Sequence, residues 1–410
     1  MPDETRMRAT MLRAEAELRD DILPFWMQHT VDTERGGFYG KVTNDLTVHA
    51  DAPRGALLSA RILWTYAAAY RRYADAAYLD MAHWAYEDLI SRFWDPEHGG
   101  FYWMVTADGQ ILRARKHIYV QAFGIYALAE YYAATGLEPA LETARRVFEL
   151  METHSHDKAH RGYFEAFDRD WQPSTELQLG DGELAAAKSM NTHLHVMEAF
   201  TNLLRVWSDP LLRTRQTELV QIMMTRVVEP ATARMNLFFD AAWNPKSENI
   251  SYGHDIEASW LLVESTEVLG NAELDVQARA LSVRMAQAVY EGGLEPDGSL
   301  VYESGPEGMV DDTKQWWPQA EAAVGFLNAY QISGEEHFLD ASLRAWDFIA
   351  AYLVDREHGE WLRYVTRDRH RPEDDGKEEQ AKVSFWKCPY HNGRACLELT
   401  ERLHQSLAAL

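Results

Sequence analysis

The sequence predicts an all-α protein, an (α/α)6 barrel of about twelve helices with short β-hairpins between the helix pairs. Three observations predict it: a short phrase that recurs along the chain, a helical spacing of apolar residues between its copies, and an alternation of two kinds of helix. Hydrophobic residues make up 46% of the 410 positions, which is enough for one large core. We therefore expect a single (α/α)6-barrel domain over residues 1–410.

The recurring phrase is a turn followed by a short aromatic strand. It stands as VDTERGGFYGKV in the first copy and as WDPEHGGFYWMV in the second. Glycine pairs permit a tight turn, and the alternating aromatic residues favour a strand, so each copy predicts a hairpin. The six copies, roughly 60 to 75 residues apart, lie at 31–42, 94–105, 157–167, 229–240, 295–304 and 354–365.

Between the copies, apolar residues recur every three or four positions, which indicates pairs of helices. The helix before each hairpin has a polar face and suits an outer ring, whereas the helix after it is apolar all round and suits an inner ring. Two polar segments, 174–188 and 368–382, are expected to be loops or lids. The expected helices occupy 6–29, 57–94, 115–151, 190–228, 254–290, 316–353 and 384–408.

Composition excludes several classes of partner. The net charge of −24 argues against binding to nucleic acid or to an anionic membrane surface. The two cysteines, Cys388 and Cys396, have neither a metal-ligand nor a CxxC spacing, which favours a reduced compartment. The first thirty residues lack the apolar segment of a signal peptide, and no apolar run is long enough to span a membrane. We therefore expect a cytoplasmic protein.

Polar residues stand out near the start of each apolar inner helix, where a buried polar side chain is informative. If these helices run parallel, all the polar clusters meet at one mouth of the barrel. His193 is expected to be structural, because it points away from His195 on a helix. The clusters are Arg61; His117, Tyr119 and Gln121; Asn191, His193 and His195; His254, Asp255 and Glu257; Trp316, Trp317 and Glu321; and Trp386, His391, Asn392 and Arg394.

Three kinds of chemistry fit these residues, since the chain has no GxxxxGK, GxGxxG or GxSxG motif. The first is proton transfer at a carbon next to a carbonyl, with two histidines as bases and Arg61 stabilising the enediolate oxygen. The second is glycoside hydrolysis by two carboxylates, drawn from Asp255, Glu257 and Glu321. The third is a sugar-binding module or a metal site on the histidines, although alternate residues of a helix diverge and chelate poorly.

Long motifs carry a resemblance from about residue 10 to the C-terminus. APRGALLSARILWTYAAAYR, RKHIYVQAFGIYALAE, SMNTHLHVMEAF, GHDIEASWLL, WWPQAEAAVGFLNAYQ and FWKCPYHNGRACLE closely resemble the cellobiose 2-epimerases of the N-acylglucosamine 2-epimerase superfamily. The resemblance implies an (α/α)6 barrel that epimerises the reducing-end glucose of a β-1,4-linked disaccharide at C2, without a cofactor or a metal. It implies a small sugar as partner, and we expect a monomer or a weak homodimer.

The resemblance also assigns roles by motif. His254 and His391 would be the general acid/base residues on opposite faces of C2, acting through a cis-enediolate. His195 would assist ring opening, Arg61 would bind the O1/O2 region, and Glu257 would orient His254. The expected sugar-binding residues are Tyr119, Asn191, Trp317 and Glu321 at the reducing end and Trp386 under the second sugar. Monosaccharide epimerases share most of these motifs, so substrate size stays open, as does the contribution of the 174–188 loop.

Overall fold

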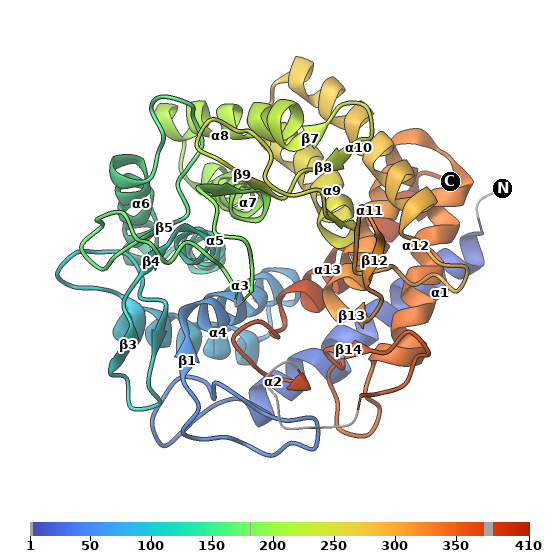
Figure 1. Cartoon of the computed structure of the whole chain (residues 1–410). Coiled ribbons are helices and arrows are strands. Elements are labelled where there is room, and N and C mark those ends of the chain that lie inside the picture. Colours follow the sequence, from blue (N-terminus) through green and yellow to red (C-terminus); the bar gives the residue numbers. More distant parts are fainter. Residues whose placement is uncertain (1–2, 181, 373–379) are drawn as a thin grey trace.

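The computed structural model describes residues 3–180, 182–372 and 380–410, and its helices form two concentric rings (Figure 1). Each inner helix contacts the next along the chain, and the last returns to contact the first, so the inner ring is closed. This arrangement confirms the predicted six-pair helical barrel. The inner helices are α3 (Ala56–Tyr73), α5 (Ile118–Thr135), α7 (Met190–Val206), α9 (Tyr252–Leu269), α11 (Trp316–Ser333) and α13 (Tyr390–Ala408).

The outer helices bury one face and the inner helices bury nearly all of theirs. Helix α6 buries residues three or four apart, such as Ala140, Ala144 and Val147, whereas the first fourteen residues of α5 are all buried. Four outer helices contain a π-helical segment. The outer ring is α1 (Glu4–Ala16) with η1 (Glu17–Ile22) and α2 (Leu23–His29), α4 (Ala76–Asp88) with η2 (Leu89–Phe93), α6 (Glu138–His154), α8 (Pro210–Ile222) with η3 (Met223–Val227), α10 (Ala272–Gly292), and α12 (Glu336–Phe348) with η4 (Ile349–Leu353).

Most helix boundaries fall within a few residues of the predicted ones, but the last helix begins later than expected. The sequence predicted a helix over 384–408, and α13 begins at Tyr390. Pro389 precedes the helix, and a residue before proline is disfavoured in the helical region, so 384–388 form turns instead. None of the helices in the described ranges combines the length and apolarity that a membrane span requires.

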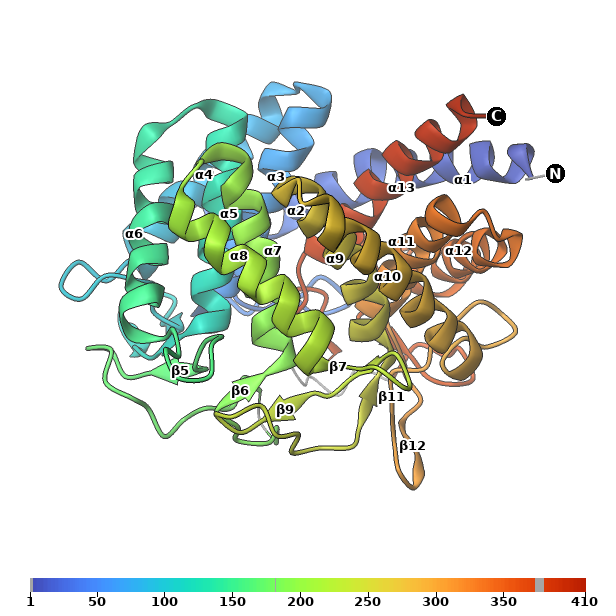
Figure 2. The ribbon, with the colours of Figure 1, turned by 90° about the horizontal axis from the view of Figure 1, so that it is seen from above.

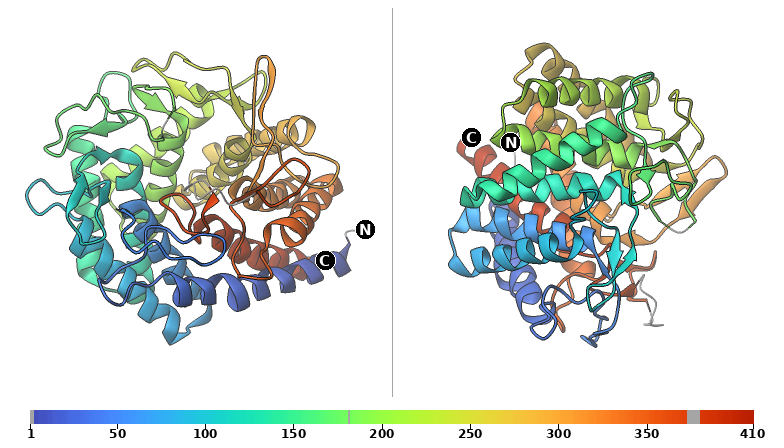
Figure 3. Two further views of the ribbon diagram at one scale, coloured as in Figure 1. Left: turned by 60° about the horizontal axis from the view of Figure 1, so that its bottom comes forward. Right: turned by 90° about the vertical axis from the view of Figure 1, so that its left-hand side faces the viewer.

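Short strands gather at one end of the two helical rings (Figures 2 and 3). The recurring phrases fold as the predicted tight turns, for example through the bridge between Trp94 and Phe101. The longer pairings, which the sequence analysis missed, join one unit to the next, as Arg54 pairs with Val105 and Lys116 with Phe167. The strands are β1 (Arg54–Gly55), β2 (Met104–Val105), β3 (Ile111–Arg113), β4 (Lys116–His117), β5 (Ala166–Phe167), β6 (Lys188–Ser189), β7 (Val228–Glu229), β8 (Arg234–Met235), β9 (Phe238–Phe239), β10 (Ile250–Ser251), β11 (Glu303–Gly305), β12 (Gly308–Asp311), β13 (Lys314–Gln315) and β14 (Tyr364–Val365).

A buried ion pair recurs where the chain enters an inner helix. The strand before the helix begins with a cation, which reaches the acidic residue of a turn: Lys116 Nζ lies 3.0 Å from Asp95, and Lys188 Nζ lies 2.8 Å from Asp157. Arg54 with Asp32 and Lys314 with Glu295 repeat the arrangement. In the fourth unit, which contains the 229–240 turn and α9, the strand before the helix begins with Ile250, so it carries no cation at the equivalent position.

A second recurring contact clamps the turns to the inner helices. The side-chain amide of Gln121, the fourth residue of α5, binds both the N–H and the C=O of Phe101 at 2.8 Å. Gly100, in the left-handed region at φ +73°, is needed there, because an added Cβ would lie 2.9 Å from the Gln121 oxygen. His193 and Asp255, also fourth in their helices, accept from the backbone N–H groups of the equivalent turns at 2.9 Å.

Three of the polar residues predicted at the mouth of the barrel form contacts of this kind instead. Gln121, Asp255 and Asn392 were expected beside the histidines at the mouth of the barrel, and that expectation was wrong. Asn392 donates to the Glu360 carboxylate at 2.6 Å, so all three hold the turns. His193 is structural, as predicted, and its second ring nitrogen lies 2.7 Å from the carbonyl of Ser189.

The clamp on α11 gives a stability prediction. Gln319 binds the N–H and C=O of Leu300 at 2.7 and 3.0 Å. Gln319→Leu leaves both buried backbone groups without a partner, so we expect the free energy of unfolding to fall by about 2 kcal/mol or more in denaturant titrations. Gln221→Leu, the same change at an exposed position of α8, is the control. Equal unfolding midpoints for the two variants would contradict the clamp.

Candidate active site

The polar residues of the inner helices form two layers around the barrel axis. Residues second in their helices make one layer, and residues sixth in their helices make the layer below, because positions four apart share a helix face. The upper layer holds Tyr119, Asn191, Trp317 and His391, and the lower layer holds Arg61, His195, Glu257 and Glu321. All except Glu321 line a cavity of about 620 Å³, together with His254, the third residue of α9.

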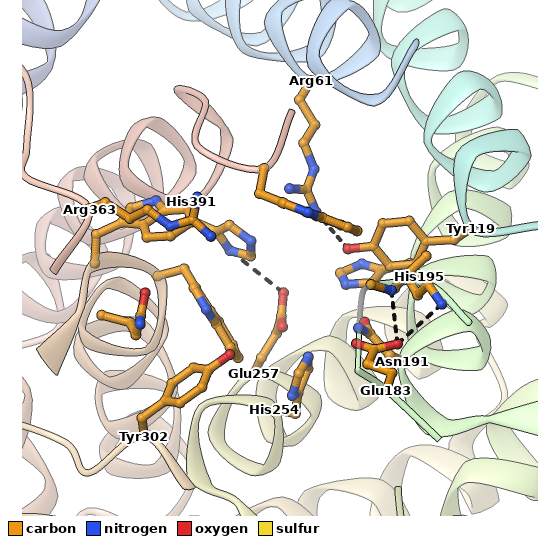
Figure 4. Close-up of a pocket in the computed structure, with 16 residues that line it drawn as sticks. Arg61, Tyr119, Glu183, Asn191, His195, His254, Glu257, Tyr302, Arg363 and His391 are labelled. Atoms are coloured by element: carbon orange, nitrogen blue, oxygen red, sulfur yellow. Dashed lines mark hydrogen bonds and ion pairs between the residues drawn. The ribbon is translucent and has the colours of Figure 1, made fainter. Parts of the chain in front are cut away.

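His391 is held from behind by a carboxylate. Its Nδ1 lies 2.7 Å from Glu321 Oε1, while Glu257, whose carboxylate reaches toward the centre of the group in Figure 4, is 4.0 Å away. Glu321 was expected to line the reducing-end subsite; instead it is buried behind His391, with its second oxygen accepting from the indole N–H of Trp260 at 3.0 Å. Glu321 is therefore placed to orient His391.

His195 has a carboxylate partner of its own, which the sequence analysis missed. Its Nδ1 lies 2.8 Å from Glu198, three residues further along α7, and Glu198 also accepts from Tyr390 and Arg394. Burial alone would raise the pKa of Glu198, but the Arg394 charge and the His195 hydrogen bond outweigh it and lower that pKa to about 2. The i to i+3 spacing was a usable signal for this pair.

His254 has a different partner from the one expected. We expected Glu257 to orient it, but Glu257 Oε1 accepts from Arg394 at 2.7 Å, and the Nδ1 of His254 lies 2.7 Å from the hydroxyl of Ser251. The ring of Trp317 packs against His254, with centroids 4.6 Å apart. Gly253 allows this approach, since a Cβ there would lie 2.7 Å from the Trp317 ring.

Burial sets the charge state of the three histidines. It lowers the pKa of His254 to about 3, with a further contribution from the nearby His195. Burial, followed by Arg61 and Arg394, lowers the pKa of His391 well below its ordinary value. The pKa of His195 is also lowered, mainly by burial and against the opposing effect of Glu198. At neutral pH all three imidazoles are therefore neutral in the empty site, and each can accept a proton.

Arg61 and the aromatic residues complete the cavity. Arg61 Nη2 donates to the hydroxyl of Tyr119 at 2.8 Å, and Trp386 lies at the rim, with its ring 6.1 Å from that of Tyr119. His117, expected in the same cluster, faces the carbonyl of Leu177 at 3.3 Å and does not line the cavity. Trp316 was among the candidates from the sequence. Six further lining residues were not, namely Leu179, Gly180, Glu183, Tyr302, Gln315 and Arg363, of which Figure 4 labels Glu183, Tyr302 and Arg363.

One of the two polar loops contributes residues to the cavity. Residues of the 174–188 segment reach the cavity, where the Glu183 carboxylate accepts from the backbone N–H groups of Leu179 and Gly180 at 3.2 Å. Those residues therefore form part of the site wall. The 368–382 segment lies partly outside the described residues, which exclude 373–379.

Three side chains lie close enough together to bind a metal ion, but an arginine side chain already pairs with the two carboxylates among them. Within the described ranges, Glu257, Glu321 and His391 place ligand atoms within 4.8 Å of one another. The Arg394 guanidinium lies 2.7 Å from both carboxylates, so it provides the cation that a metal would otherwise supply. The histidine metal site considered from the sequence does not assemble, because both nitrogens of His193 bind backbone groups.

Comparison with known proteins agrees with this geometry. The family model described as N-acylglucosamine 2-epimerase matches residues 37–387. The chain is 42% identical over 386 residues to a cellobiose 2-epimerase of Bacteroides fragilis, covering 94% of this chain and 97% of that one. It is 23% identical to the N-acylglucosamine 2-epimerase of Mus musculus, covering 87% and 84%.

A solved structure resembles this chain over nearly its whole length. The cellobiose 2-epimerase of Bacillus thermoamylovorans B4167 superposes with a TM-score of 0.91 at 40% identity, covering 96% of this chain and all of that one. The family match extends over most of the barrel and includes every inner helix except the last. The chain therefore belongs to the N-acylglucosamine 2-epimerase family and is an epimerase.

Proposed function

We propose that the protein epimerises the reducing-end glucose unit of β-1,4-linked disaccharides at C2, converting cellobiose to glucosyl-mannose and lactose to epilactose. The observation that carries this proposal is the pair His254 and His391, which come from α9 and α13 and line one cavity. Both rings pack against Trp317, with centroids 4.6 and 5.5 Å from it. The higher identity to a cellobiose 2-epimerase than to an N-acylglucosamine 2-epimerase supports the disaccharide.

Two neutral histidines in one cavity suit proton transfer at carbon. One imidazole removes the C2 proton of the open-chain sugar, and the electron pair moves into the carbonyl to form a cis-enediolate. The other histidine is neutral in the empty site, so it takes up a proton from solvent before this step and delivers it to the opposite face of C2, which inverts that carbon. Glu321 behind His391 stabilises the imidazolium that forms when His391 takes the proton, as a carboxylate does for a general-base histidine.

Arg61 and His195 serve the rest of the substrate. Arg61 is nearly fully buried and lines the cavity, so its guanidinium stabilises the developing oxyanion strongly at the low local dielectric. His195, held by Glu198, faces the same space and assists ring opening. Tyr119, Asn191 and Trp317 bind the reducing-end unit, and Trp386 at the rim stacks on the second sugar.

The geometry disfavours glycoside hydrolysis. A hydrolase needs two carboxylates on either side of the scissile bond, with the substrate between them. Glu257 and Glu321 instead share one guanidinium on the same side, and Glu321 does not reach the cavity. Asp255 accepts from the Met235 N–H at 2.9 Å, so it is a clamp and not an acid catalyst.

Each of the two histidines is expected to be essential. His254→Ala and His391→Ala should each reduce C2 epimerisation of cellobiose by at least about 10³-fold, because each removes one of two required proton carriers. NMR of cellobiose, lactose, glucose and mannose in D2O measures both the epimer and the deuterium at C2. Near-normal epimerisation by either variant would refute the two-base assignment, and release of free glucose from cellobiose would favour the hydrolase.

The carboxylate behind His391 should act on kcat. Glu321→Gln keeps the size of the side chain but cannot stabilise an imidazolium, so we expect kcat to fall by about 10²-fold or more with little change in KM. Glu336→Gln, on the outer helix α12, is the matched control. A rise in KM at unchanged kcat would mean that Glu321 binds substrate after all.

The second-sugar role of Trp386 makes a substrate-dependent prediction. Trp386→Ala should lower kcat/KM for cellobiose by about tenfold, because aromatic packing is worth roughly 1.5 kcal/mol, and should affect glucose much less. Trp84→Ala, on the outside of α4, controls for the loss of a large aromatic side chain. Equal losses on cellobiose and glucose would remove the second-sugar role and favour a monosaccharide substrate.

A further inference from the structure

The three histidines of the cavity are not held alike. His195 and His391 each place Nδ1 against a carboxylate, Glu198 at 2.8 Å and Glu321 at 2.7 Å. His254 places Nδ1 against a hydroxyl, that of Ser251 at 2.7 Å. A carboxylate accepts only, so it fixes a proton on Nδ1 and stabilises the charged ring, whereas a hydroxyl can donate or accept and carries no charge.

Ser251 departs from the usual behaviour of a residue at its position. It precedes the first residue of α9, where a serine side chain normally accepts a helix N–H, yet it makes no such bond. Ser189, at the same position before α7, does so and accepts the Thr192 N–H at 3.1 Å. In α9 the hydroxyl is instead directed to His254, and the backbone of Ser251 is fixed by pairing with Glu303 of β11.

His254 lies between two cavities, so its ring requires something to hold it. It lines the catalytic cavity and also a second cavity of about 620 Å³ beside it, whose wall includes Ser251. Trp317 packs on the His254 ring but forms no hydrogen bond with it. The hydrogen bond between Ser251 and Nδ1 is therefore the contact that orients the His254 ring, with Nε2 as its other nitrogen.

The remaining charged groups around His254 are shared with the rest of the site. Those on the catalytic side are His195 on α7, Glu257 on α9, Glu321 on α11, His391 on α13, Arg61 on α3, Arg363 directly before β14 and Glu183 in the 174–188 loop. Those on the side of the second cavity are Glu165, Lys246, Glu248 and Glu303. Among the described residues, none of these makes a hydrogen bond to the His254 ring.

We propose that Ser251 is a positioning residue for the epimerisation, which aims the Nε2 of His254 at C2 and, by offering a neutral hydroxyl, makes His254 the weaker base and the readier proton donor of the pair. This inference rests on the proposed function. It explains why one histidine is held by a carboxylate and the other is not. In an epimerisation one group must remove a proton while the other supplies one, and unequal partners let the two histidines differ in proton affinity.

Removing and restoring the hydroxyl tests the positioning. Ser251→Ala should lower kcat on cellobiose about ten- to hundredfold with KM within about twofold, and Ser251→Thr should restore most of the rate. Thermal stability should be unchanged in Ser251→Ala, because no helix cap is lost, whereas Ser189→Ala should lower it. A wild-type kcat in Ser251→Ala, or a loss that appears only in KM, would overturn the proposal.

A charge placed at the same position tests the unequal basicity without any substrate. Ser251→Asp should raise the pKa of His254 by about one pH unit or more relative to Ser251→Asn, as followed by ¹⁵N NMR of the full-length protein. It should move the acidic limb of the kcat/KM profile to higher pH. Equal His254 titration in the two variants would overturn the proposal. If His254 titrates as expected but wild-type protein exchanges no C2 proton in any tested sugar, the proposed function has failed, and the role of Ser251 in epimerisation is overturned with it.

Discussion

Arg394 is the cation on which the buried charges of this site depend. From α13 it contacts Glu198 on α7, Glu257 on α9 and Glu321 on α11, so four of the six inner helices meet at one guanidinium. An isolated buried carboxylate costs several kcal/mol, and removing the cation would leave three of them unpaired. This network is a poor source of stability, but it fixes the relative positions of the helices that carry the histidines.

The charge balance of this network also bears on the substrate. One arginine does not neutralise three buried carboxylates, and burial together with the nearby Glu321 raises the pKa of Glu257 well above its ordinary value. The Glu257–Glu321 pair therefore holds a proton at neutral pH. The second oxygen of Glu257 has no hydrogen-bond partner within the described part of the chain, and Glu257 lines the cavity. That oxygen is available to a sugar hydroxyl, which suits a polar substrate better than an apolar one.

The sequence was enough to predict the architecture but not the grouping of the polar residues. The repeated turn and the two kinds of helix follow from local spacing, so the helical barrel and the position of the histidines at one mouth could be inferred. The sequence could not distinguish Gln121 and Asp255, which hold turns, from the residues that line the cavity. Both kinds of residue lie within the same turn of an inner helix, at most four positions apart. Glu257 and Glu321 occupy equivalent positions, and only the packing of α13 decides which of them supports a histidine.

The pairing of strands between neighbouring units was also beyond local pattern, since Arg54 and Val105 are far apart in the chain. Its regularity makes the fourth unit informative. There, Ile250 replaces the buried cation, Glu229 of the turn is exposed, and Ser251 does not cap its helix. The serine before α9 accepts no helix N–H, so its hydroxyl is available to hold that histidine. The unit that lacks both the recurring strand cation and the serine cap is the one that carries His254, as expected where stability is exchanged for a functional geometry.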